Sequence, residues 1–270
     1  MKTLPISTSI ILLIFIIFVG CRATIEDNIK KGDEMISKSK IEKALFYYNK
    51  ALEIDSTASI VYSKIGNIHL NNNDTAQALN YFLIAYNQKL NDYYLHYKIG
   101  NIYKSKKDTL NAIKHYTKAI EINDKKSEVY VERGILNYYT KNYELSLNDF
   151  NQAITLDKTK LLVIVDEEKG IPKNIRGEEK VKEILYPYII PYAYRAKIKE
   201  INKDYYGAIS DADFILTCIP DYGSIYFVRG NIYLILGNTK KACEDWSKAN
   251  DYGIKDGLKN IQSYCNSINN

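Results

Sequence analysis

Small residues recur along this chain of 270 residues at a constant step of 34 residues. Six positions share the step in two blocks, and they hold Gly32, Gly66, Gly100 and Gly134, then Ala196 and Gly230. A second small residue, an aromatic and an alanine follow at fixed distances, as Ala112, Tyr116 and Ala119 follow Gly100. The fifth copy departs from this order at Ala212 and Ile215. A period of this length, with small residues where helices cross and aromatics that fill the remaining space, indicates a solenoid of helical hairpins.

One copy, residues 93–126, shows how such a hairpin is encoded. Apolar and aromatic residues at spacings of three and four predict two helices, at about 94–104 and 109–122. A polar break separates them, and Asp108 at its end can cap the second helix by accepting a backbone N–H. A single hairpin cannot bury its apolar faces, so we expect neighbouring copies to cover them.

The last complete copy carries the fullest version of the pattern: Tyr226, Arg229, Gly230, Tyr233, Ala242, Trp246 and Ala249. This order resembles that of the tetratricopeptide repeat (TPR) family. The resemblance covers six repeats, with repeats one to four at about 25–160 and repeats five and six at about 189–256. It implies an all-α, right-handed TPR solenoid of about six helix-turn-helix repeats, with one insertion at 161–188. Apolar residues at helical spacing in the last stretch, 257–270, predict a C-terminal capping helix.

The insertion at 161–188 has its own pattern. Residues 161–165 form an apolar run that favours a β-strand, a charged loop follows, and a short helix is expected at 177–185. Pro187 and Pro191 bracket the entry to the fifth repeat. Two interpretations stay open, because the insertion could be a loop packed on the edge of the solenoid or an adaptor that shapes the binding surface.

Residues 1–20 are expected to be a lipoprotein signal peptide. Lys2 supplies a positive start, and the apolar run at 10–19 has the length of a signal-peptide core, shorter than the ~20 residues of a membrane span. Residues 18–21 resemble a bacterial lipobox, which implies cleavage before Cys21 and lipidation of that cysteine. Residues 21–24 would then be a lipidated tether. The alternative is an uncleaved membrane anchor, and either one places the remaining chain in the bacterial cell envelope, on the periplasmic or the outer-membrane face.

The other cysteines are Cys218, Cys243 and Cys265. Cys243 would lie near the start of one helix and Cys265 near the end of the next. These ends meet in an antiparallel pair, so the geometry permits a disulfide, and an exported compartment allows one to form. The alternative is that both are buried thiols. Cys218 is expected to be a single buried thiol.

The sequence offers no chemistry for catalysis. His69, His96 and His115 fall on separate predicted helices without metal-ligand spacing, which favours a packing role, and no phosphate-binding loop, nucleophile elbow or zinc motif is present. The formal net charge of +5 comes from interspersed charges, which indicates a solvated surface rather than a nucleic-acid footprint. We therefore expect no enzyme activity, no cofactor, no metal and no nucleic-acid partner.

The resemblance also places a binding surface. In TPR proteins the first helix of each repeat lines a concave groove, and an Asn directly after the Gly often hydrogen-bonds an extended peptide. Asn67, Asn101 and Asn231 match that position, and Tyr97 and Phe227 lie four residues earlier on the same face. An amide side chain donates and accepts, which suits a peptide unit. The alternative is that each Asn satisfies local helix contacts.

Together these features predict a membrane-anchored scaffold or adaptor that binds a protein or peptide partner and catalyses nothing. The lipid would fix the chain to a membrane, and the solenoid would offer a preformed groove. One alternative is a subunit of an outer-membrane or pilus assembly machine, by resemblance to TPR lipoproteins. Another is a glycan-binding envelope lipoprotein, because Tyr and Asn also suit sugars.

Overall fold

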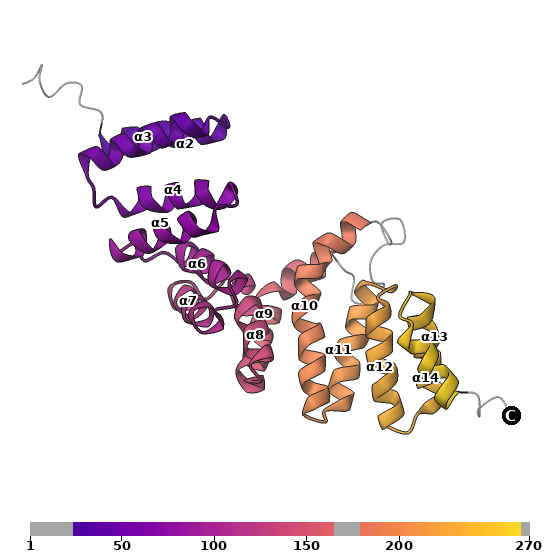
Figure 1. Ribbon diagram of the computed structural model, residues 1–270. Coiled ribbons are helices and arrows are strands. Elements are labelled where there is room, and N and C mark those ends of the chain that lie inside the picture. Colours follow the sequence, from indigo (N-terminus) through magenta and orange to yellow (C-terminus); the bar gives the residue numbers. More distant parts are fainter. Residues whose placement is uncertain (1–23, 165–178, 266–270) are drawn as a thin grey trace, which may run out of the picture. The chain divides into compact units, whose positions relative to one another are not determined.

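The computed structural model describes residues 24–164 and 179–265, and within these ranges all regular secondary structure is helical (Figure 1). This confirms the predicted all-α fold class. The described helices are α2 (Ile25–Ser37), α3 (Ile41–Ile54), α4 (Ser59–Asn71), α5 (Thr75–Asn87), α6 (Tyr93–Ser105), α7 (Thr109–Ile122), α8 (Ser127–Tyr139), α9 (Tyr143–Ile164), α10 (Glu179–Ile201), α11 (Tyr205–Cys218), α12 (Gly223–Ile235), α13 (Thr239–Asp251) and α14 (Asp256–Tyr264).

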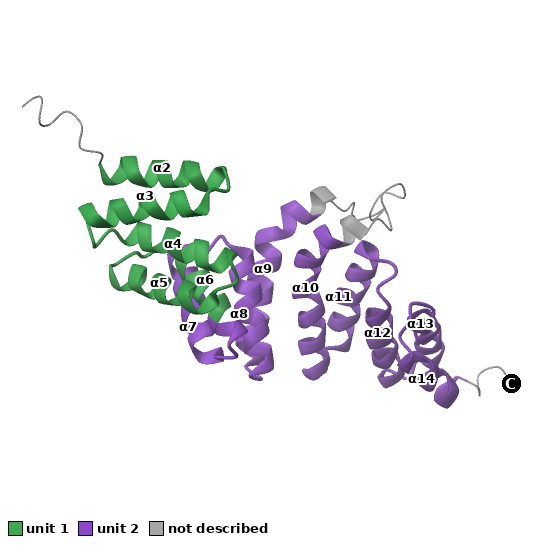
Figure 2. Ribbon diagram, turned by 45° about the horizontal axis from the view of Figure 1, so that its top comes forward, with its two compact units in different colours: residues 1–102 green, residues 103–270 purple. Residues whose placement is uncertain are grey.

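The helices fall into two compact units, residues 1–102 and 103–270, with the boundary inside α6 (Figure 2). In unit 1, α2 packs against α3, and α4 packs against α5. In unit 2, the hairpins α8–α9, α10–α11 and α12–α13 follow one another, and α14 packs against α13. We call the first helix of each repeat its A helix and the second its B helix, so that α6 and α7 are the A and B helices of repeat three.

Four of the turns between A and B helices share one capping scheme. Asp74, Asp108, Asp204 and Asn238 each accept a hydrogen bond from the backbone N–H three residues later, at 3.0 to 3.1 Å. These bonds satisfy donors that a helix start leaves without an intrahelical partner. The predicted cap at Asp108 is confirmed.

The same turns require one residue in the left-handed backbone region. The residue has positive φ in all six turns: Ser39, Asn73, Lys107, Lys141, Lys203 and Gly237. Only the sixth turn uses glycine, the residue that adopts this conformation without steric cost. Three of the turns therefore hold a lysine in an unfavourable backbone conformation.

The repeated glycines lie against the aromatic side chain of the partner B helix. A Cβ atom built on Gly32 would lie 2.3 Å from Tyr48, and one on Gly66 would lie 2.7 Å from Phe82. The same contact recurs in unit 2 at Gly134 with Phe150 (2.9 Å) and at Gly230 with Trp246 (2.8 Å). These aromatic rings are almost fully buried. The A helix can approach the B helix this closely only because it lacks a side chain there.

Repeat five departs from the pattern at both partners of this contact. Ala196 stands where the other repeats have glycine, and Ala212 stands where they have an aromatic; both are buried. The two deviations compensate each other in volume, because losing the ring leaves space for the extra Cβ. The weak match of repeat five is therefore a paired substitution within the same packing scheme.

The insertion differs from the expected strand. Helix α9 continues to Ile164, so residues 161–164 are helical. Leu161 is buried in one cluster with Leu185 and Ile189 of α10. Burial of these side chains between helices outweighs an intrinsic β preference that is worth less than about 1 kcal/mol per residue. Residues 165–178, which hold most of the predicted loop, lie outside the described part of the chain.

Helix α10 also differs from the expectation at its prolines. It runs from Glu179 to Ile201 and contains both Pro187 and Pro191. A proline inside a helix lacks the N–H that would bond four residues back, and it usually kinks or ends the helix. Here the helix continues through both prolines, so they lie inside a lengthened A helix of repeat five and do not form a break before it.

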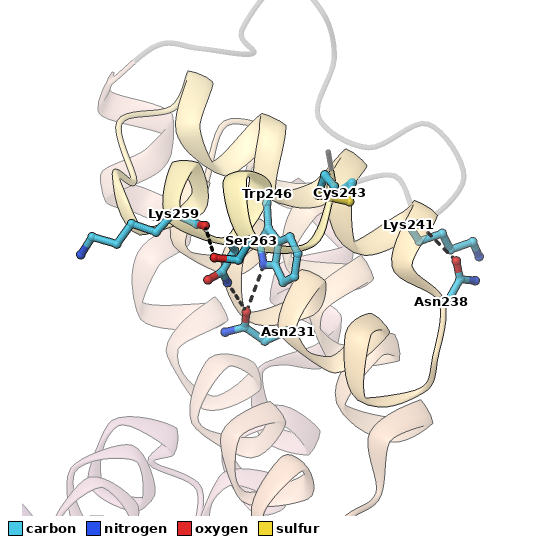
Figure 3. Close-up of a disulfide and its surroundings, with 9 residues drawn as sticks. Asn231, Asn238, Lys241, Cys243, Trp246, Lys259 and Ser263 are labelled. Atoms are coloured by element: carbon cyan, nitrogen blue, oxygen red, sulfur yellow. Dashed lines mark hydrogen bonds between the residues drawn. A yellow bond between two sulfur atoms is a disulfide. The ribbon is translucent and has the colours of Figure 1, made fainter. Parts of the chain in front are cut away.

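The C-terminal end is closed by α14 and a disulfide. Cys243 of α13 and Cys265 are bonded, with their Cα atoms 5.9 Å apart (Figure 3). The two cysteines are 22 residues apart, and a loop of this size corresponds to about 3 kcal/mol of stabilisation in the chain-entropy account. Cys218 is a free, buried thiol, and burial raises its pKa to about 12, so it stays protonated and unreactive at neutral pH.

The glycine–aromatic contact can be tested in repeat four with a double-mutant cycle. Gly134→Ala should destabilise the protein by about 1–3 kcal/mol, because its Cβ would overlap the Phe150 ring. In a Phe150→Ala background, which copies repeat five, the same change should become stabilising by about 1 kcal/mol through helix propensity. Urea unfolding followed by circular dichroism measures all four proteins. Equal effects of Gly134→Ala in both backgrounds would contradict the packing account.

The turn geometry gives a second prediction with opposite signs at equivalent positions. Lys203→Gly should stabilise the protein by about 0.5–1 kcal/mol, because it removes the left-handed strain of a residue with φ of 62°. Gly237→Ala should destabilise it by about 1 kcal/mol, because alanine would have to adopt the left-handed φ of 75°. Steric overlap does not contribute, since a Cβ at this position would have no atom within 4 Å. Thermal unfolding of the two variants decides the point, and a loss of stability in Lys203→Gly would refute it.

Candidate binding surfaces

The predicted peptide-binding residues lie on one stripe of each A helix. The positions three before, one after and five after the repeated small residue are four residues apart, so they follow one another along the same helix face. In α12 they are Phe227, Asn231 and Ile235. We call these positions on all A helices the A-helix face.

In unit 1 the A-helix face holds Asn67 of α4. Its side chain is half-buried, and its buried Oδ1 atom has no hydrogen-bond partner among the described residues. The corresponding residue of α2 is Asp33, which accepts hydrogen bonds from Tyr48 (2.7 Å) and Lys64 (2.8 Å). An unsatisfied buried acceptor costs free energy, and because this Oδ1 is buried, a ligand does not reach it in this conformation.

Asn101 and Tyr97 are the corresponding residues of α6. Both are half-buried and both interact with other residues of the chain. The next turn of this helix carries Lys104, which forms a 2.6 Å ion pair with Glu132 of α8.

In unit 2 the structure gives Asn231 a packing role. Its Oδ1 accepts hydrogen bonds from Trp246 Nε1 (3.0 Å) and from Asn260 Nδ2 (3.1 Å), which ties α12 to α13 and α14 (Figure 3). That acceptor is therefore occupied, and only the amide NH₂ of Asn231 could serve a peptide. Phe227 is half-buried and packs against hydrophobic clusters on both sides of α12, so most of its surface belongs to the core.

The most exposed apolar residues of the A-helix face were missed from the sequence. Tyr139, Ile201 and Ile235 are the last residues of α8, α10 and α12, and they are 68, 47 and 55% exposed. The corresponding residues of repeats one to three are polar: Ser37, Asn71 and Ser105. Aligning the repeats would have revealed these residues, because the position five after the small residue is polar in repeats one to three and apolar in repeats four to six.

An aromatic cluster surrounds the first of these residues. The hydroxyl oxygens of Tyr139 and Tyr194 are 3.2 Å apart, and Tyr138 packs edge-on against both rings. Tyr194 in turn stacks on Phe150, and Lys197 lies 5.4 Å above its ring. Burial raises the pKa of Tyr194, so its hydroxyl is neutral at physiological pH. The cluster presents a rigid aromatic surface with polar tips.

A second missed feature is a series of arginine–aspartate pairs in repeats four to six. In each repeat the arginine before the small residue forms two parallel bonds with an aspartate on the B helix, at 2.6 to 3.0 Å: Arg133 with Asp149, Arg195 with Asp211, and Arg229 with Asp245. The third guanidinium nitrogen donates a hydrogen bond to the B helix of the preceding repeat: Arg133 to Thr117, Arg195 to Asn151 and Arg229 to Asp213.

These pairs are internal connectors. The three aspartates are at most 5% exposed, and burial raises the pKa of Asp149 although Arg133 and Asn137 act to lower it. Removing one partner of such a pair leaves a buried charge and costs about 3–5 kcal/mol. A sequence search would have found them as an arginine and an aspartate at a constant separation in three successive repeats.

The histidines take part in ring packing. His69 stacks on Tyr81 at 5.1 Å, His115 stacks on Tyr103 at 5.7 Å, and His96 meets the Tyr86 ring edge-on at 5.2 Å. No group of three or more metal-ligating side chains occurs within 24–164 and 179–265. The lipidation candidate Cys21 lies outside the described residues.

This architecture is similar to that of known proteins. The sequence model of the tetratricopeptide repeat family matches residues 28–57 and 93–126. No curated protein matches the sequence. Among solved structures, PilF of Pseudomonas aeruginosa is similar with a TM-score of 0.56 and 12% identity, over 90% of this chain and 97% of that chain. MamA from Desulfovibrio magneticus RS-1 gives a TM-score of 0.55 and 13% identity, over 72 and 94%.

At these identities the structural likeness shows the fold alone. The family match, the constant period and the stacked hairpins agree with one another. The chain therefore contains tetratricopeptide repeats, which the family model matches at 28–57 and 93–126.

Proposed function

We propose that this protein is a non-catalytic scaffold that holds a protein or peptide partner on its A-helix face while a lipid on Cys21 anchors it in the bacterial cell envelope. The TPR fold, as a fold of protein-interaction scaffolds, supports the binding role. The anchor and the location rest on the sequence pattern of residues 1–21. Among the described helices, none is long and apolar enough to span a membrane.

The observation that carries the binding role is the row of exposed apolar residues Tyr139, Ile201 and Ile235. Each ends an A helix of unit 2, and about half or more of each side chain is exposed. Exposed apolar residues at one repeat position offer a surface that a partner can cover, and apolar surface of this kind is used for binding when it is contiguous. Burying them under a partner would supply the hydrophobic part of the binding energy.

Polar groups on the same face can fix the direction of a bound peptide. In unit 2, Lys197 is exposed between Tyr139 and Ile235 in the order of the repeats. A peptide backbone needs donors and acceptors at intervals, and it gains most from a surface that is already rigid. The A helices provide that rigidity through their buried glycine contacts and arginine pairs.

The proposal assigns no catalytic step. The buried carboxylates of unit 2 are paired with arginines, and the three histidines pack against aromatic rings. The alternative of an outer-membrane or pilus assembly subunit is compatible with the likeness to PilF, which extends over most of both chains but shows only the shared fold.

The A-helix face can be tested with substitutions taken from the chain's own first repeats. The triple variant Tyr139→Ser, Ile201→Asn, Ile235→Ser should reduce partner capture about tenfold or more in a crosslinking pull-down from native membranes, because it removes three exposed apolar contacts. Its free energy of unfolding should fall by no more than about 1–2 kcal/mol, because the residues are exposed and the main loss is the ring contacts of Tyr139 with Tyr138 and Tyr194. Leu110→Asn, at a residue of α7 that is 80% exposed, is the matched control. Capture unchanged in the triple variant would overturn the proposed surface.

The anchor is tested separately through Cys21. Cys21→Ser should move the protein from the membrane fraction to the soluble fraction, because each acyl CH₂ adds about 0.8 kcal/mol of membrane affinity. Intact-mass spectrometry should show acyl chains on the wild type and none on the variant. Cys218→Ser, which changes a buried thiol, serves as control. Retention of Cys21→Ser in the membrane would favour an uncleaved anchor instead.

A further inference from the structure

Side chains of neighbouring A helices in unit 2 meet at one recurring pair of positions. The residue four after the small residue contacts the residue two before the small residue of the next repeat. Between repeats three and four this contact is the 2.6 Å ion pair of Lys104 with Glu132. Between repeats four and five it joins the rings of Tyr138 and Tyr194, with centroids 5.1 Å apart. The contact therefore matches side chains by character, charge with opposite charge and ring with ring.

Repeat five lacks this match at Glu200. The corresponding residue of repeat six is Val228, which packs with the apolar cluster of Ala208, Ile209 and Ile232 and offers no positive charge. The Glu200 side chain is half-buried, and no hydrogen bond or ion pair to another described residue engages its carboxylate. Glu200 thus stands where Lys104 stands in repeat three, but without an oppositely charged partner.

Lys197 lies one helical turn before Glu200 and does not neutralise it. The Lys197 Nζ atom lies 5.4 Å from the ring centroid of Tyr194. Burial raises the pKa of Glu200, and the charge of Lys197 opposes this shift without cancelling it. The charge of Glu200 contributes in turn to the raised pKa of Tyr138, so the carboxylate lies close enough to act on that ring. Glu200 is therefore a partly desolvated carboxylate beside a tyrosine.

The fold shows which group satisfies a carboxylate and a tyrosine ring together. Arg133, Arg195 and Arg229 each form an ion pair with an aspartate. Each guanidinium carbon also lies over a tyrosine ring, 5.1 to 5.9 Å from the centroid. Tyr138 and Glu200 offer the same two groups, and both side chains are partly exposed on the surface of unit 2.

The rings also have similar surroundings, because other aromatic side chains cover them. Phe214 stacks on Tyr192 at 4.5 Å in repeat five, and Tyr252 stacks on Tyr226 at 5.9 Å in repeat six. Three tyrosine rings lie 5.1 to 5.8 Å from the ring of Tyr138: Tyr139, Tyr143 and Tyr194. The arginine is the member of the set that Tyr138 and Glu200 do not have.

We propose that Glu200 binds an arginine or lysine side chain of the peptide or protein partner, with the ring of Tyr138 beside the cation. The inference rests on the proposed function, because Glu200 stands between Lys197 and Ile201, two residues of the A-helix face. A partner that covers Ile201 also removes water from Glu200, and a buried carboxylate without a cation is strongly unfavourable. Arginine is favoured over lysine, because its planar guanidinium pairs with a carboxylate through two bonds and stacks on a ring.

The test measures whether Glu200 and one cation of a peptide act on each other. A phage library of random linear peptides is selected on the full-length protein, and an enriched peptide is synthesised with a fluorescent label. We expect the selected peptides to carry arginine next to apolar residues. Glu200→Gln should raise the Kd about tenfold, and so should replacing the peptide arginine by glutamine. Both changes together should cost no more than either alone, because each removes the same ion pair.

A matched control removes the same charge from the same helix. Glu183 is an exposed residue of α10, about 25 Å from Glu200 at 1.5 Å per residue, which is beyond the Debye length of about 8 Å. Glu183→Gln should therefore change the Kd by less than about twofold. Glu200→Gln should keep the wild-type melting temperature or exceed it, because the amide has the same shape and removes a desolvated charge. Lost binding is then not lost folding.

The triple variant of Tyr139, Ile201 and Ile235 separates this inference from the proposed function. It should also weaken the selected peptide about tenfold or more, because the cation and the apolar contacts belong to one surface. Weak binding to the triple variant with normal binding to Glu200→Gln would overturn the cation site and keep the A-helix face. Weak binding to Glu200→Gln alone would support the cation site and contradict the apolar row. Peptides that bind both variants normally, or a selection that enriches no basic peptide, would overturn the cation site.

Discussion

The close approach of each A helix to an aromatic ring of its B helix sets the geometry of every other contact. At Gly32 and Gly66 in unit 1, and at Gly134 and Gly230 in unit 2, the ring occupies the space that a Cβ would need. This distance decides where the flanking residues fall. The residue before the glycine is brought over the B helix, where Arg133 and Arg229 meet Asp149 and Asp245. The residue after the glycine lies beside the ring, where Asp33 accepts a hydrogen bond from Tyr48 and Asn231 accepts one from Trp246. Packing and binding surfaces thus derive from one small residue per repeat.

Much of this could be predicted from the sequence because the signals were local or periodic. The step between Gly32 and Gly134 gave the hairpins, and Asp108 was recognised as a cap from its place before an apolar periodic run. The strand expected at 161–165 was wrong because β preference is weak and depends on surroundings. Leu161 finds its partners on α10, which the sequence of residues 161–165 does not reveal.

The surfaces were harder to predict because they depend on which side-chain atoms remain available after packing. Asn67 and Asn231 occupy equivalent positions in the sequence, yet only the Oδ1 of Asn231 accepts hydrogen bonds, from a tryptophan and from a second asparagine. Part of that difference arises from α14, which follows repeat six and supplies Asn260. The rest arises from the ring itself, because Trp246 has an N–H donor where repeat two has Phe82. An aligned motif identifies a position, whereas the neighbours of each copy decide whether its polar atoms can reach a ligand.

Comparing the repeats with one another separates structural from functional positions more sharply than comparing any one of them with a family pattern. Positions where a change in one residue is matched by a change in its partner, as at Ala196 and Ala212, serve packing. At Gln152 and Leu156 the aromatic cover seen in repeats five and six is replaced by smaller or polar side chains, while Tyr130, Arg133 and Asp149 beneath are kept. Tyr130 is nevertheless as buried as Tyr226, at 8 and 7% exposed, so the two repeats bury this ring to the same extent with different side chains. Packing therefore preserves the burial of this tyrosine and not the identity of the residue that covers it.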